Sequence, residues 1–375
     1  MRLLLATSAN AGHFGPMVPF AEACRRAGHE VLVAAPVSFA AAVERAGLRH
    51  WPCPDVDPDE RAAFMERFLA APPEQRNEIT VMMGAEMGAR SILPGMLSAI
   101  DEWRPDVVLR EIGELGSALA AELRGVPQVQ VLIGLAKFLG FTAALGGRAL
   151  AGLRVSLGLP ADENGRFLSD TPSVSLLPPS FEEPGGPRVH RFRPPVPAPA
   201  SDWGGEVPLV YVTFGTVSAR VPFAAAMLRT VVEAVADLPV RVLATVGDEG
   251  PVDGFPPHVR VERWVPQHEV LASAAVMVCH GGTGTVLGGL TAGVPMVVVP
   301  QFADQPDNAA RVAATGVGLA VGGGEERPAT AAEVLAAVEK VLGSPSYRAA
   351  AAGFRDEIAG LLPVDEAVTL ITGVA

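Results

Sequence analysis

The stretch Val276–Pro300, VMVCHGGTGTVLGGLTAGVPMVVVP, predicts a strand, a glycine-rich turn at Gly281–Gly284, a short helix and a second strand. A glycine costs about 1 kcal/mol relative to alanine inside a helix, so glycines here predict that the backbone approaches a ligand closely. Free backbone N–H groups and the positive end of the helix would suit a pyrophosphate. The glycine spacing is not the dinucleotide fingerprint. A plain tight turn is the alternative interpretation.

The alternation of strand and helix recurs along the chain and predicts two domains. Leu3–Ala6 and Arg104–Glu111 are predicted strands in the first half, and Leu209–Thr216 begins a second series. Such alternation is typical of parallel sheets. Prolines and small residues crowd together between the series. We expect an α/β chain with Rossmann-like domains at 1–193 and 207–375, a linker at 194–206, a cleft between the facing domains, and a last helix that packs back on the first.

Composition and charge exclude several functions. The chain has 375 residues, a net charge of −12 and 49% hydrophobic residues. Nucleic acids and anionic membranes are bound by basic surfaces, so neither is an expected partner. Cys24, Cys53 and Cys279 are expected to be buried, which fits a reducing cytoplasm. The N-terminus lacks a signal-peptide core, and Lys137 interrupts the apolar stretch from Val131, so no stable membrane insertion is expected.

Polar residues gather around the glycine-rich turn. His280 ends the strand before it, Trp264 precedes that strand, and Asp304 and Gln305 follow the next one. An indole can stack on a base, and carboxylate and amide groups can bind sugar hydroxyls. Structural alternatives are Trp264 in the core, Gln267 in a turn and Asp304 as a helix N-cap. Their coincidence at strand ends of one domain predicts a ligand site.

His13 is the candidate general base in the first domain. It lies in the loop between the first strand and a helix expected from about Pro16. An unperturbed imidazole has a pKa near 6.5, so it can accept a proton at neutral pH. Glu111 ends another strand at the same edge of the sheet and could orient it. The alternative is a hydrogen-bonded structural histidine.

Two further segments of the first domain have an open interpretation. Asp55–Asp57 form a D-x-D pair that could hold Mg²⁺ or Mn²⁺, but flanking prolines favour a solvated loop. Apolar residues between Phe64 and Met87 predict either an amphipathic helix pair with an inward-facing stripe or a wall that binds a ligand.

Several motifs together resemble one family of enzymes. They are WVPQ at 264–267, HGGTGT at 280–285, AGVPMVVVPQFADQPDNAARV at 292–312, GVGLA at 316–320, and AGHFGPMVPFAEACRRAGHEV at 11–31. The chain resembles the GT-B inverting glycosyltransferases, in particular bacterial enzymes that glycosylate antibiotics and other natural products. The resemblance covers nearly the whole chain and implies sugar transfer from a nucleoside diphosphate without a metal or cofactor.

The resemblance also implies roles for particular residues. The pyrophosphate would be held by His280, Gly282, Thr283 and Gly284. The rest of the donor would be held by Trp264 and Val265 at the base, by Gln267, by Asp304 and Gln305 at the sugar, and by Thr216 near the phosphate or sugar. His13 would deprotonate an acceptor hydroxyl that attacks the anomeric carbon from the face opposite the diphosphate, so that configuration inverts.

Two departures from the family pattern refine these expectations. Relatives that use UDP-sugars carry a glutamate for the ribose hydroxyls where this chain has Gly288, so we expect a TDP-linked deoxysugar. Relatives pair the histidine with an aspartate, whereas this chain has Glu111. The acceptor, expected to be hydrophobic, would contact apolar side chains of the first domain: Phe64, Phe68, Met83, Met87 and Phe138.

Other functions remain open on the sequence alone. They are a UDP-sugar-dependent sterol or small-molecule glucosyltransferase, a sugar-nucleotide 2-epimerase, a binding or auxiliary protein without catalysis, and a nicotinamide dehydrogenase. A homodimer also remains open.

Overall fold

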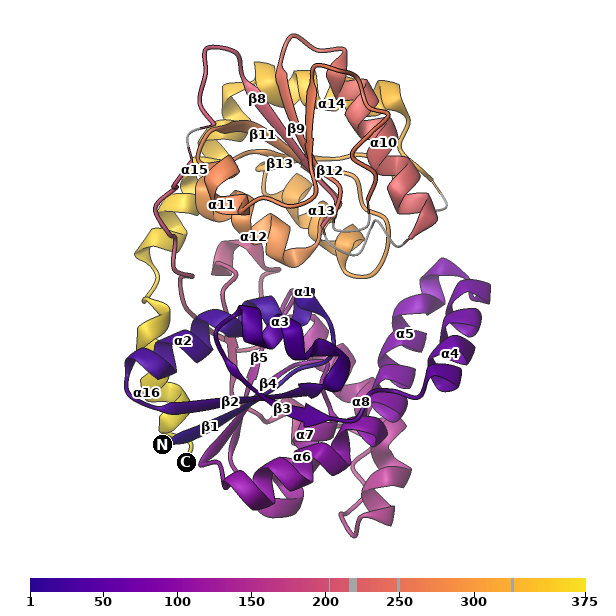
Figure 1. Cartoon of the computed structure of the whole chain (residues 1–375), viewed down its shortest axis with the longest axis vertical. Coiled ribbons are helices and arrows are strands. Elements are labelled where there is room, and N and C mark those ends of the chain that lie inside the picture. Colours follow the sequence, from indigo (N-terminus) through magenta and orange to yellow (C-terminus); the bar gives the residue numbers. More distant parts are fainter. Residues whose placement is uncertain (202, 216–220, 248–249, 325–326) are drawn as a thin grey trace. The chain divides into compact units, whose positions relative to one another are not determined.

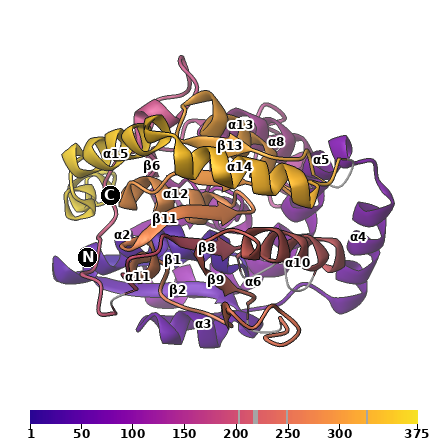
Figure 2. The same ribbon diagram turned by 90° about the horizontal axis from the view of Figure 1, so that it is seen from above.

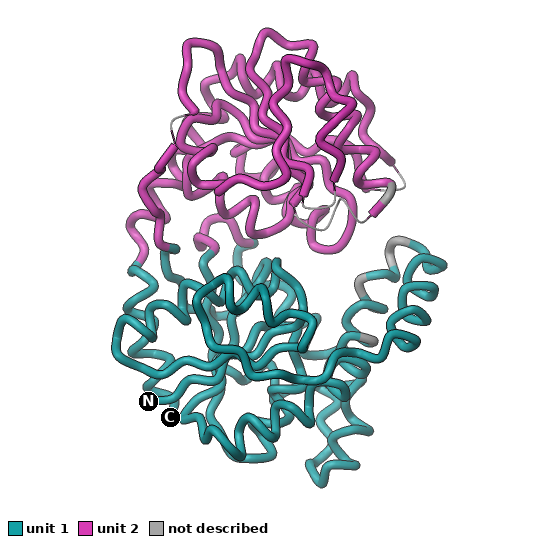
Figure 3. The backbone as a smooth tube through the Cα atoms, in the orientation of Figure 1, with its two compact units in different colours: residues 1–176, 183–194, 362–375 teal, residues 177–182, 195–361 magenta. Residues whose placement is uncertain are grey.

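The computed structural model of the chain describes residues 1–201, 203–215, 221–247, 250–324 and 327–375. The chain forms two compact units, which we describe one at a time. Unit 1 comprises residues 1–176, 183–194 and 362–375, and unit 2 comprises residues 177–182 and 195–361 (Figure 3). Each unit is a Rossmann-like α/β layer structure around a parallel sheet.

The sheet of unit 1 has the strand order β3-β2-β1-β4-β5-β6-β7, and its pairings are parallel. Its strands are β1 (Arg2–Ala6), β2 (Glu30–Pro36), β3 (Arg49–Cys53), β4 (Val107–Glu111), β5 (Gln128–Val131), β6 (Ser173–Ser175) and β7 (His190–Arg191). The apolar run of β1 is buried from Leu3 to Ala6, because helices cover both faces of the sheet.

Helices α6, α7 and α8 pack on one face of this sheet, and α2 and α16 pack on the other (Figure 1). The helices of unit 1 are α1 (Ala11–Phe14), α2 (Val18–Arg26), α3 (Ala40–Arg45), α4 (Pro58–Ala70), α5 (Pro73–Met83), α6 (Ala89–Trp103), α7 (Gly116–Arg124), α8 (Phe138–Ser156), α9 (Arg166–Ser169) and α16 (Ala367–Thr372). Shorter helical turns are η1 (Gly15–Met17), η2 (Val37–Phe39), the π-helical η3 (Gly84–Gly88) and η6 (Val364–Glu366).

The first helix begins earlier than the sequence predicted. It was expected from about Pro16, but α1 begins at Ala11, because the side chain of Asn10 caps it by accepting a hydrogen bond from the Gly12 N–H at 2.8 Å. His13 therefore lies in a one-turn helix rather than in an irregular loop. Pro16 lies in the following turn, η1.

Unit 2 repeats the strand arrangement with the order β10-β9-β8-β11-β12-β13, again with parallel pairings. Its strands are β8 (Leu209–Thr213), β9 (Arg241–Thr245), β10 (Val259–Glu262), β11 (Ala274–Cys279), β12 (Met296–Val298) and β13 (Gly318–Ala320). Its helices are α10 (Pro222–Ala236), α11 (Gln267–Leu271), α12 (Thr283–Ala292), α13 (Gln305–Ala314), α14 (Ala331–Gly343) and α15 (Pro345–Gly360), with the turn η4 (Pro179–Phe181).

The core of unit 2 lies between its sheet and the neighbouring helices α10 and α14 (Figure 2). Helices α12 and α13 contact β11 and β12 respectively, and α15 packs on α12.

Two short segments pack with a unit most of which lies elsewhere in the sequence. They are residues 177–182, which belong to unit 2, and residues 362–375, which belong to unit 1. Phe181 is buried in unit 2, where its ring lies 5.9 Å from that of Phe354, and Arg311 donates to its carbonyl at 2.7 Å. At the C-terminus, α16 packs on α2, and Asp365 accepts a hydrogen bond from Arg26 at 2.9 Å. Each unit therefore takes its core from more than one stretch of the chain.

In both sheets the strand order reverses direction beside the first strand. The reversal falls between β1 and β4 in unit 1 and between β8 and β11 in unit 2. Ligands of open α/β sheets bind beyond the carboxyl ends of strands at such a switch point. His13 and Glu111 follow or end the first pair of strands, and His280 follows β11.

Candidate functional site

His13 and Glu111 lie together at the switch point of unit 1. The Nδ1 atom of His13 is 2.9 Å from Oε1 of Glu111, with the histidine side chain 33% exposed and the glutamate side chain 0% exposed. A carboxylate only accepts hydrogen bonds, so a neutral imidazole in this pair carries its proton on Nδ1 and its lone pair on Nε2. Glu111, whose side chain is longer than that of the aspartate that relatives have, therefore reaches His13.

The carboxylate of Glu111 is held in its charged form. Burial raises its pKa, but the charge of His13 and hydrogen bonds from His13, the Gly113 N–H and the Ser8 hydroxyl outweigh burial, so the pKa lies below its usual value. An ionised Glu111 stabilises a protonated imidazole beside it. The pair can therefore accept a proton on His13.

Ser8 is a residue of this site that the sequence analysis did not identify. Its hydroxyl lies 3.1 Å from Nδ1 of His13 and 3.2 Å from Oε1 of Glu111. The available signal was weak: a hydroxyl residue shortly after the first strand, in the segment that leads into α1.

The glycine-rich turn of unit 2 is shorter than predicted. Helix α12 begins at Thr283, because Gly282 is its N-cap in an extended conformation. Gly281 has a φ of 91°, which favours glycine, and a Cβ on Gly282 would lie 2.5 Å from Nε2 of His280. Nothing lies within 4 Å of where a Cβ of Gly284 would be. The first N–H groups of α12 have no partners within the helix, so they suit an anion.

His280 is a neutral imidazole at the head of this turn. Burial lowers its pKa to about 4, and a hydrogen bond with the backbone of Thr213 offsets this only in part. Its ring stacks on that of Phe214, with centroids 6.2 Å apart. Nδ1 is buried, with no hydrogen-bond partner among the residues that the structure describes. The side chain therefore has unused hydrogen-bonding capacity next to the turn.

A buried hydrogen-bond network ties α13 to the start of α12. Oδ2 of Asp304 accepts from the Thr283 hydroxyl at 2.7 Å and from Nδ2 of Asn308 at 2.9 Å. The same nitrogen lies 2.8 Å from the carbonyl oxygen of Gly281, and Asn308 is 0% exposed. Asp304 occupies the N-cap position but its side chain makes no capping bond. The sequence analysis missed Asn308, which looks like an ordinary polar helix residue.

The other predicted donor residues have different environments. Trp264 is 64% exposed, so it does not belong to the core, and Val265 beside it is half-buried. Gln267 begins α11, and its amide nitrogen donates to the carbonyl of Thr285 at 3.3 Å. Gln305 is 4% exposed, and its amide oxygen accepts from the N–H groups of Gln301 and Phe302. Gln305 thus shapes the loop before α13.

Two predicted residues lie outside what the structure describes. These are Thr216, in the segment after β8, and the side chain of Met83 in α5.

The predicted acceptor residues lie on a run of neighbouring helices in unit 1. Phe64 and Phe68 are half-buried on α4, with ring centroids 6.0 Å apart, and Met87 and Phe138 are half-buried in η3 and at the start of α8. Helix α5 contacts both η3 and α8. An inward-packed stripe is wrong for α4, because none of its residues is buried. Its apolar side chains are accessible instead.

The acidic D-x-D segment has a structural role. Asp57 caps α4 by accepting from the N–H of Asp59 at 2.9 Å, and Asp55 accepts from the N–H of Ser38 at 3.0 Å. In the part of the chain that the structure describes, no group of three or more His, Cys, Asp or Glu residues could hold a metal ion.

The three cysteines are buried, as predicted, and burial raises the pKa of each thiol to about 12. Among the described helices, none has both the length and the apolar character that crossing a membrane requires.

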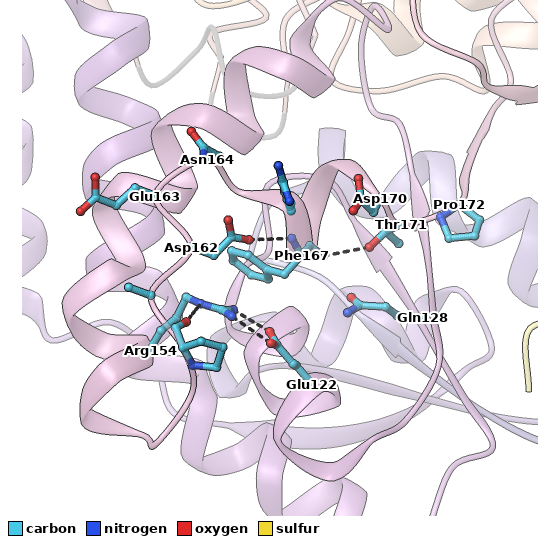
Figure 4. Close-up of a pocket in the computed structure, with 13 residues that line it drawn as sticks. Glu122, Gln128, Arg154, Asp162, Glu163, Asn164, Phe167, Asp170, Thr171 and Pro172 are labelled. Carbon is cyan, nitrogen blue, oxygen red and sulfur yellow. Dashed lines mark hydrogen bonds and ion pairs between the residues drawn. The ribbon is translucent and has the colours of Figure 1, made fainter.

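A separate pocket of about 770 Å³ opens at the other edge of the sheet of unit 1 (Figure 4). Gln128 begins β5 and Pro172 precedes β6, so the pocket lies at the amino ends of these strands. Arg154 in its wall is bonded to both carboxylate oxygens of Glu122, at 2.6 and 2.8 Å, and stacks over Phe167. None of the predicted site residues lines this pocket.

Two Rossmann-like units, with a histidine–carboxylate pair at one switch point and a glycine-rich turn at the other, define a glycosyltransferase of the GT-B fold. A solved structure supports this class: glycosyltransferase VinC in complex with dTDP, with a TM-score of 0.81, 26% identity and coverage of 100% of this chain and 99% of VinC. The chain belongs to the erythromycin biosynthesis protein CIII-like family, whose N-terminal domain model matches residues 22–155 and whose C-terminal domain model matches residues 229–370.

Curated relatives match over nearly their whole length. The 4'-demethylrebeccamycin synthase of Lentzea aerocolonigenes is 31% identical, with 99% of both chains covered. The L-demethylnoviosyl transferase of Streptomyces niveus is 33% identical, with 95% of this chain and 94% of the relative covered. These matches confirm the predicted class, and the protein is a glycosyltransferase.

Proposed function

We propose that the protein transfers a deoxysugar from a TDP-sugar to a hydrophobic natural-product aglycone in antibiotic biosynthesis, in the cytoplasm and without a metal or cofactor. The observation that carries the proposal is the 2.9 Å contact between His13 Nδ1 and Glu111 Oε1, which provides a base. VinC, which shares the fold over its whole chain, was solved with dTDP. One relative is a 4'-demethylrebeccamycin synthase and another is an L-demethylnoviosyl transferase.

In the reaction, Nε2 of His13 removes the proton of the acceptor hydroxyl as the oxygen attacks the anomeric carbon. The bond between that carbon and the diphosphate oxygen breaks, and TDP leaves with the electron pair. Attack from the opposite face inverts the configuration. Glu111 stabilises the imidazolium that forms, because its buried carboxylate lies 2.9 Å from Nδ1 of His13.

On the donor side, the first N–H groups of α12 at Thr283 and Gly284, together with a neutral His280, bind the diphosphate. The single N–H of a neutral imidazole would have to turn from the Thr213 backbone to the diphosphate, so most of the attraction for the anion comes from the backbone of α12. Asp304 binds the sugar, beside the loop that Gln305 shapes. Trp264 stacks on the base through its exposed indole.

Gly288 is the basis for the proposed preference for TDP. A Cβ at this position would lie 3.0 Å from the amide carbon and nitrogen of Gln267. The space where UDP-dependent relatives place a carboxylate therefore adjoins an uncharged amide. A carboxylate here would bind both hydroxyls of a ribose and so favour UDP. Without it, a nucleotide with 2′-deoxyribose, such as TDP, gives up no hydrogen bond that UDP would make.

The half-buried aromatic side chains of α4 and α8, with Met83 and Met87, are proposed to contact the aglycone. They come from helical segments joined by contacts with α5, which touches α4, η3 and α8, and thioether and aromatic groups adapt to polycyclic surfaces.

Titration calorimetry of the full chain with TDP, UDP, ADP and NAD⁺ in EDTA tests the donor. A TDP affinity at least tenfold above that for UDP, about 1.4 kcal/mol, is expected. Higher affinity for UDP would contradict the argument from Gly288, and a requirement for added Mg²⁺ would contradict the metal-free mechanism. Mass spectrometry of reactions with a TDP-deoxysugar and a panel of polycyclic and macrolide aglycones then tests transfer, and NMR of the product tests inversion.

A further inference from the structure

We propose that Asp304 promotes release of the product TDP, because its carboxylate lies beside the anion-binding end of α12 and repels the extra charge that TDP carries. The inference rests on the proposed function, in which the first N–H groups of α12 bind the diphosphate and Asp304 binds the sugar. It gives Asp304 a second role, which begins when the sugar has been transferred.

Asp304 is bonded directly to the first residue of α12. Its Oδ2 accepts a hydrogen bond from the Thr283 hydroxyl at 2.7 Å, and α12 begins at Thr283. The N–H of the same residue is one of the groups proposed to bind the diphosphate. Two hydrogen bonds and the width of one residue therefore separate the carboxylate from the anion. This is less than the Debye length of about 10 Å at 0.1 M ionic strength, so salt does not fully screen the two charges.

The fold holds the carboxylate in this place. Nδ2 of the buried Asn308 donates to the same Oδ2 at 2.9 Å and to the carbonyl oxygen of Gly281 at 2.8 Å. Hydrogen-bond donors stabilise the negative charge of a carboxylate. The preceding residue, Ala303, has a φ of 58°, which is unfavourable for a residue with a Cβ. Such strain persists where the surrounding structure enforces it, and it is concentrated at functional positions.

The reaction changes the charge that faces Asp304. In a TDP-sugar, each of the two phosphates carries a single negative charge. When the bond to the anomeric carbon breaks, the diphosphate oxygen keeps the electron pair, and the terminal phosphate then carries about −1.5 to −2 charges at pH 7. The added charge appears on the phosphate that held the sugar, next to the residue that binds the sugar. Repulsion by the carboxylate is therefore stronger for TDP than for the donor.

Asp304 thus acts with opposite sign on the two nucleotides. The carboxylate accepts a hydrogen bond from the sugar of the donor, and this bond is lost when the sugar leaves. Only the repulsion remains for TDP. The N–H groups of α12 attract both nucleotides, and without a carboxylate beside them they would favour the product, which has the higher charge.

Titration calorimetry with the full chain at pH 8 compares D304N with the wild type. The amide oxygen of asparagine can replace Oδ2 and accept from Thr283 and Asn308, so D304N removes the charge and keeps these contacts. The two ligands are TDP and its β-methyl ester, which has no sugar and lacks the extra charge. We expect D304N to bind TDP more tightly, and the ratio of TDP affinity to methyl-ester affinity to rise about 3- to 10-fold.

Two further variants make the comparison specific. E339Q removes a carboxylate from an exposed position on α14 and controls for the change in net charge, so its ratio should equal that of the wild type. D304A removes the charge together with the bonds from Thr283 and Asn308, and its ratio should rise as in D304N. A partly unfolded sample leaves the ratio unchanged, because both ligands are measured on the same protein.

Kinetics with the donor and acceptor that the transfer assay identifies provide a second readout. In D304N we expect the inhibition constant of TDP to fall and the KM of the donor to rise, because the variant loses both the repulsion and the bond to the sugar. A damaged nucleotide site would raise both constants.

The two proposals fail in different ways. A ratio in D304N and D304A that does not exceed that of the wild type overturns the role of Asp304 in product release, whatever nucleotide the chain prefers. Tighter binding of UDP than of TDP by the wild type contradicts the proposed donor, even where D304N raises the ratio.

Discussion

Two histidines lie at the switch points of the two units and have opposite chemistry. His13 lies in α1, after the strand β1 on one side of the switch, and His280 follows β11, the strand on the other side of the switch in its own sheet. His13 lies beside a buried, ionised Glu111, whereas His280 is buried against Phe214 and a pKa of about 4 keeps it neutral. The fold therefore sets the position of each histidine, and the neighbouring side chains set whether the imidazole binds a proton.

In the proposed mechanism, one histidine serves catalysis and the other serves binding. A base must gain a positive charge during the reaction, so it needs a carboxylate at hydrogen-bond distance. A group that binds a diphosphate beside a helix N-terminus needs only to donate, so it can remain uncharged.

The largest effect is expected from removal of the proposed base. H13A is expected to lower kcat by about 10²- to 10⁴-fold with an aliphatic acceptor, while TDP affinity stays within about twofold, because the proposed role of His13 concerns only the acceptor proton. Steady-state kinetics and calorimetry measure the two effects. E111Q, which keeps the shape of the side chain but not its charge, should lower kcat less than H13A. A variant that loses TDP affinity instead would place His13 in the donor site.

The converse change is next in size. H280A should raise the Kd for TDP about 10- to 100-fold, the effect of losing a hydrogen bond to a charged group. Calorimetry measures it, with H190A on the exposed β7 as the matched control. Unchanged affinity for TDP in H280A would show that the backbone of α12 binds the diphosphate without this side chain.

Asn308 tests whether the turn of unit 2 depends on its buried support. N308A removes the hydrogen bonds from Nδ2 to the buried carbonyl oxygen of Gly281 and to Oδ2 of Asp304, so we expect a loss of about 1–3 kcal/mol in the free energy of unfolding and weaker TDP binding. Chemical denaturation and calorimetry report these two quantities. N164A, at an exposed position of unit 1, is the control. Wild-type stability in N308A would mean that the network is not needed.

The smallest expected effect concerns pH. The pKa of His280 is lowered from 6.5 to about 4 in the folded chain, so between these values the unfolded chain binds a proton that the folded chain does not. His280 therefore lowers the stability of the folded chain as the pH falls from 6.5 towards 4. Above pH 6.5 it does not contribute to the pH dependence of stability. We expect the wild-type melting temperature to drop about 2 °C more than that of H280Q between pH 7.5 and 5. Parallel curves for the two proteins would contradict the neutral state of His280.

The sheet edges could be predicted from the sequence, and contacts made by side chains could not. Apolar runs such as Leu3–Ala6 followed by helices predict parallel strands, and their carboxyl ends must share an edge, which brought His13 and Glu111 together in advance. Relatives have an aspartate in place of Glu111, and the structure shows that the longer glutamate side chain contacts His13 at 2.9 Å.

What the sequence could not provide depends on tertiary placement. Ser8 and Asn308 are polar residues of ordinary type, and only the fold shows that one completes a triangle with the base and that the other is buried. Helix α4 has an apolar pattern that predicts an inward face, yet none of its residues is buried. The early start of α1 depends on one capping side chain.

The interleaved chain has a consequence for hybrid enzymes. A single exchange of halves between two relatives at 194–206 would take Phe181 from one parent and Phe354 from the other, and α16 would meet a foreign α2. The unit boundaries fall at 176/177, 182/183, 194/195 and 361/362. A recombinant that moves 177–182 with the second half and returns 362–375 to the first keeps each hydrophobic core within one parent. In this chain, each compact unit is inherited as an interleaved module rather than as one half of the sequence.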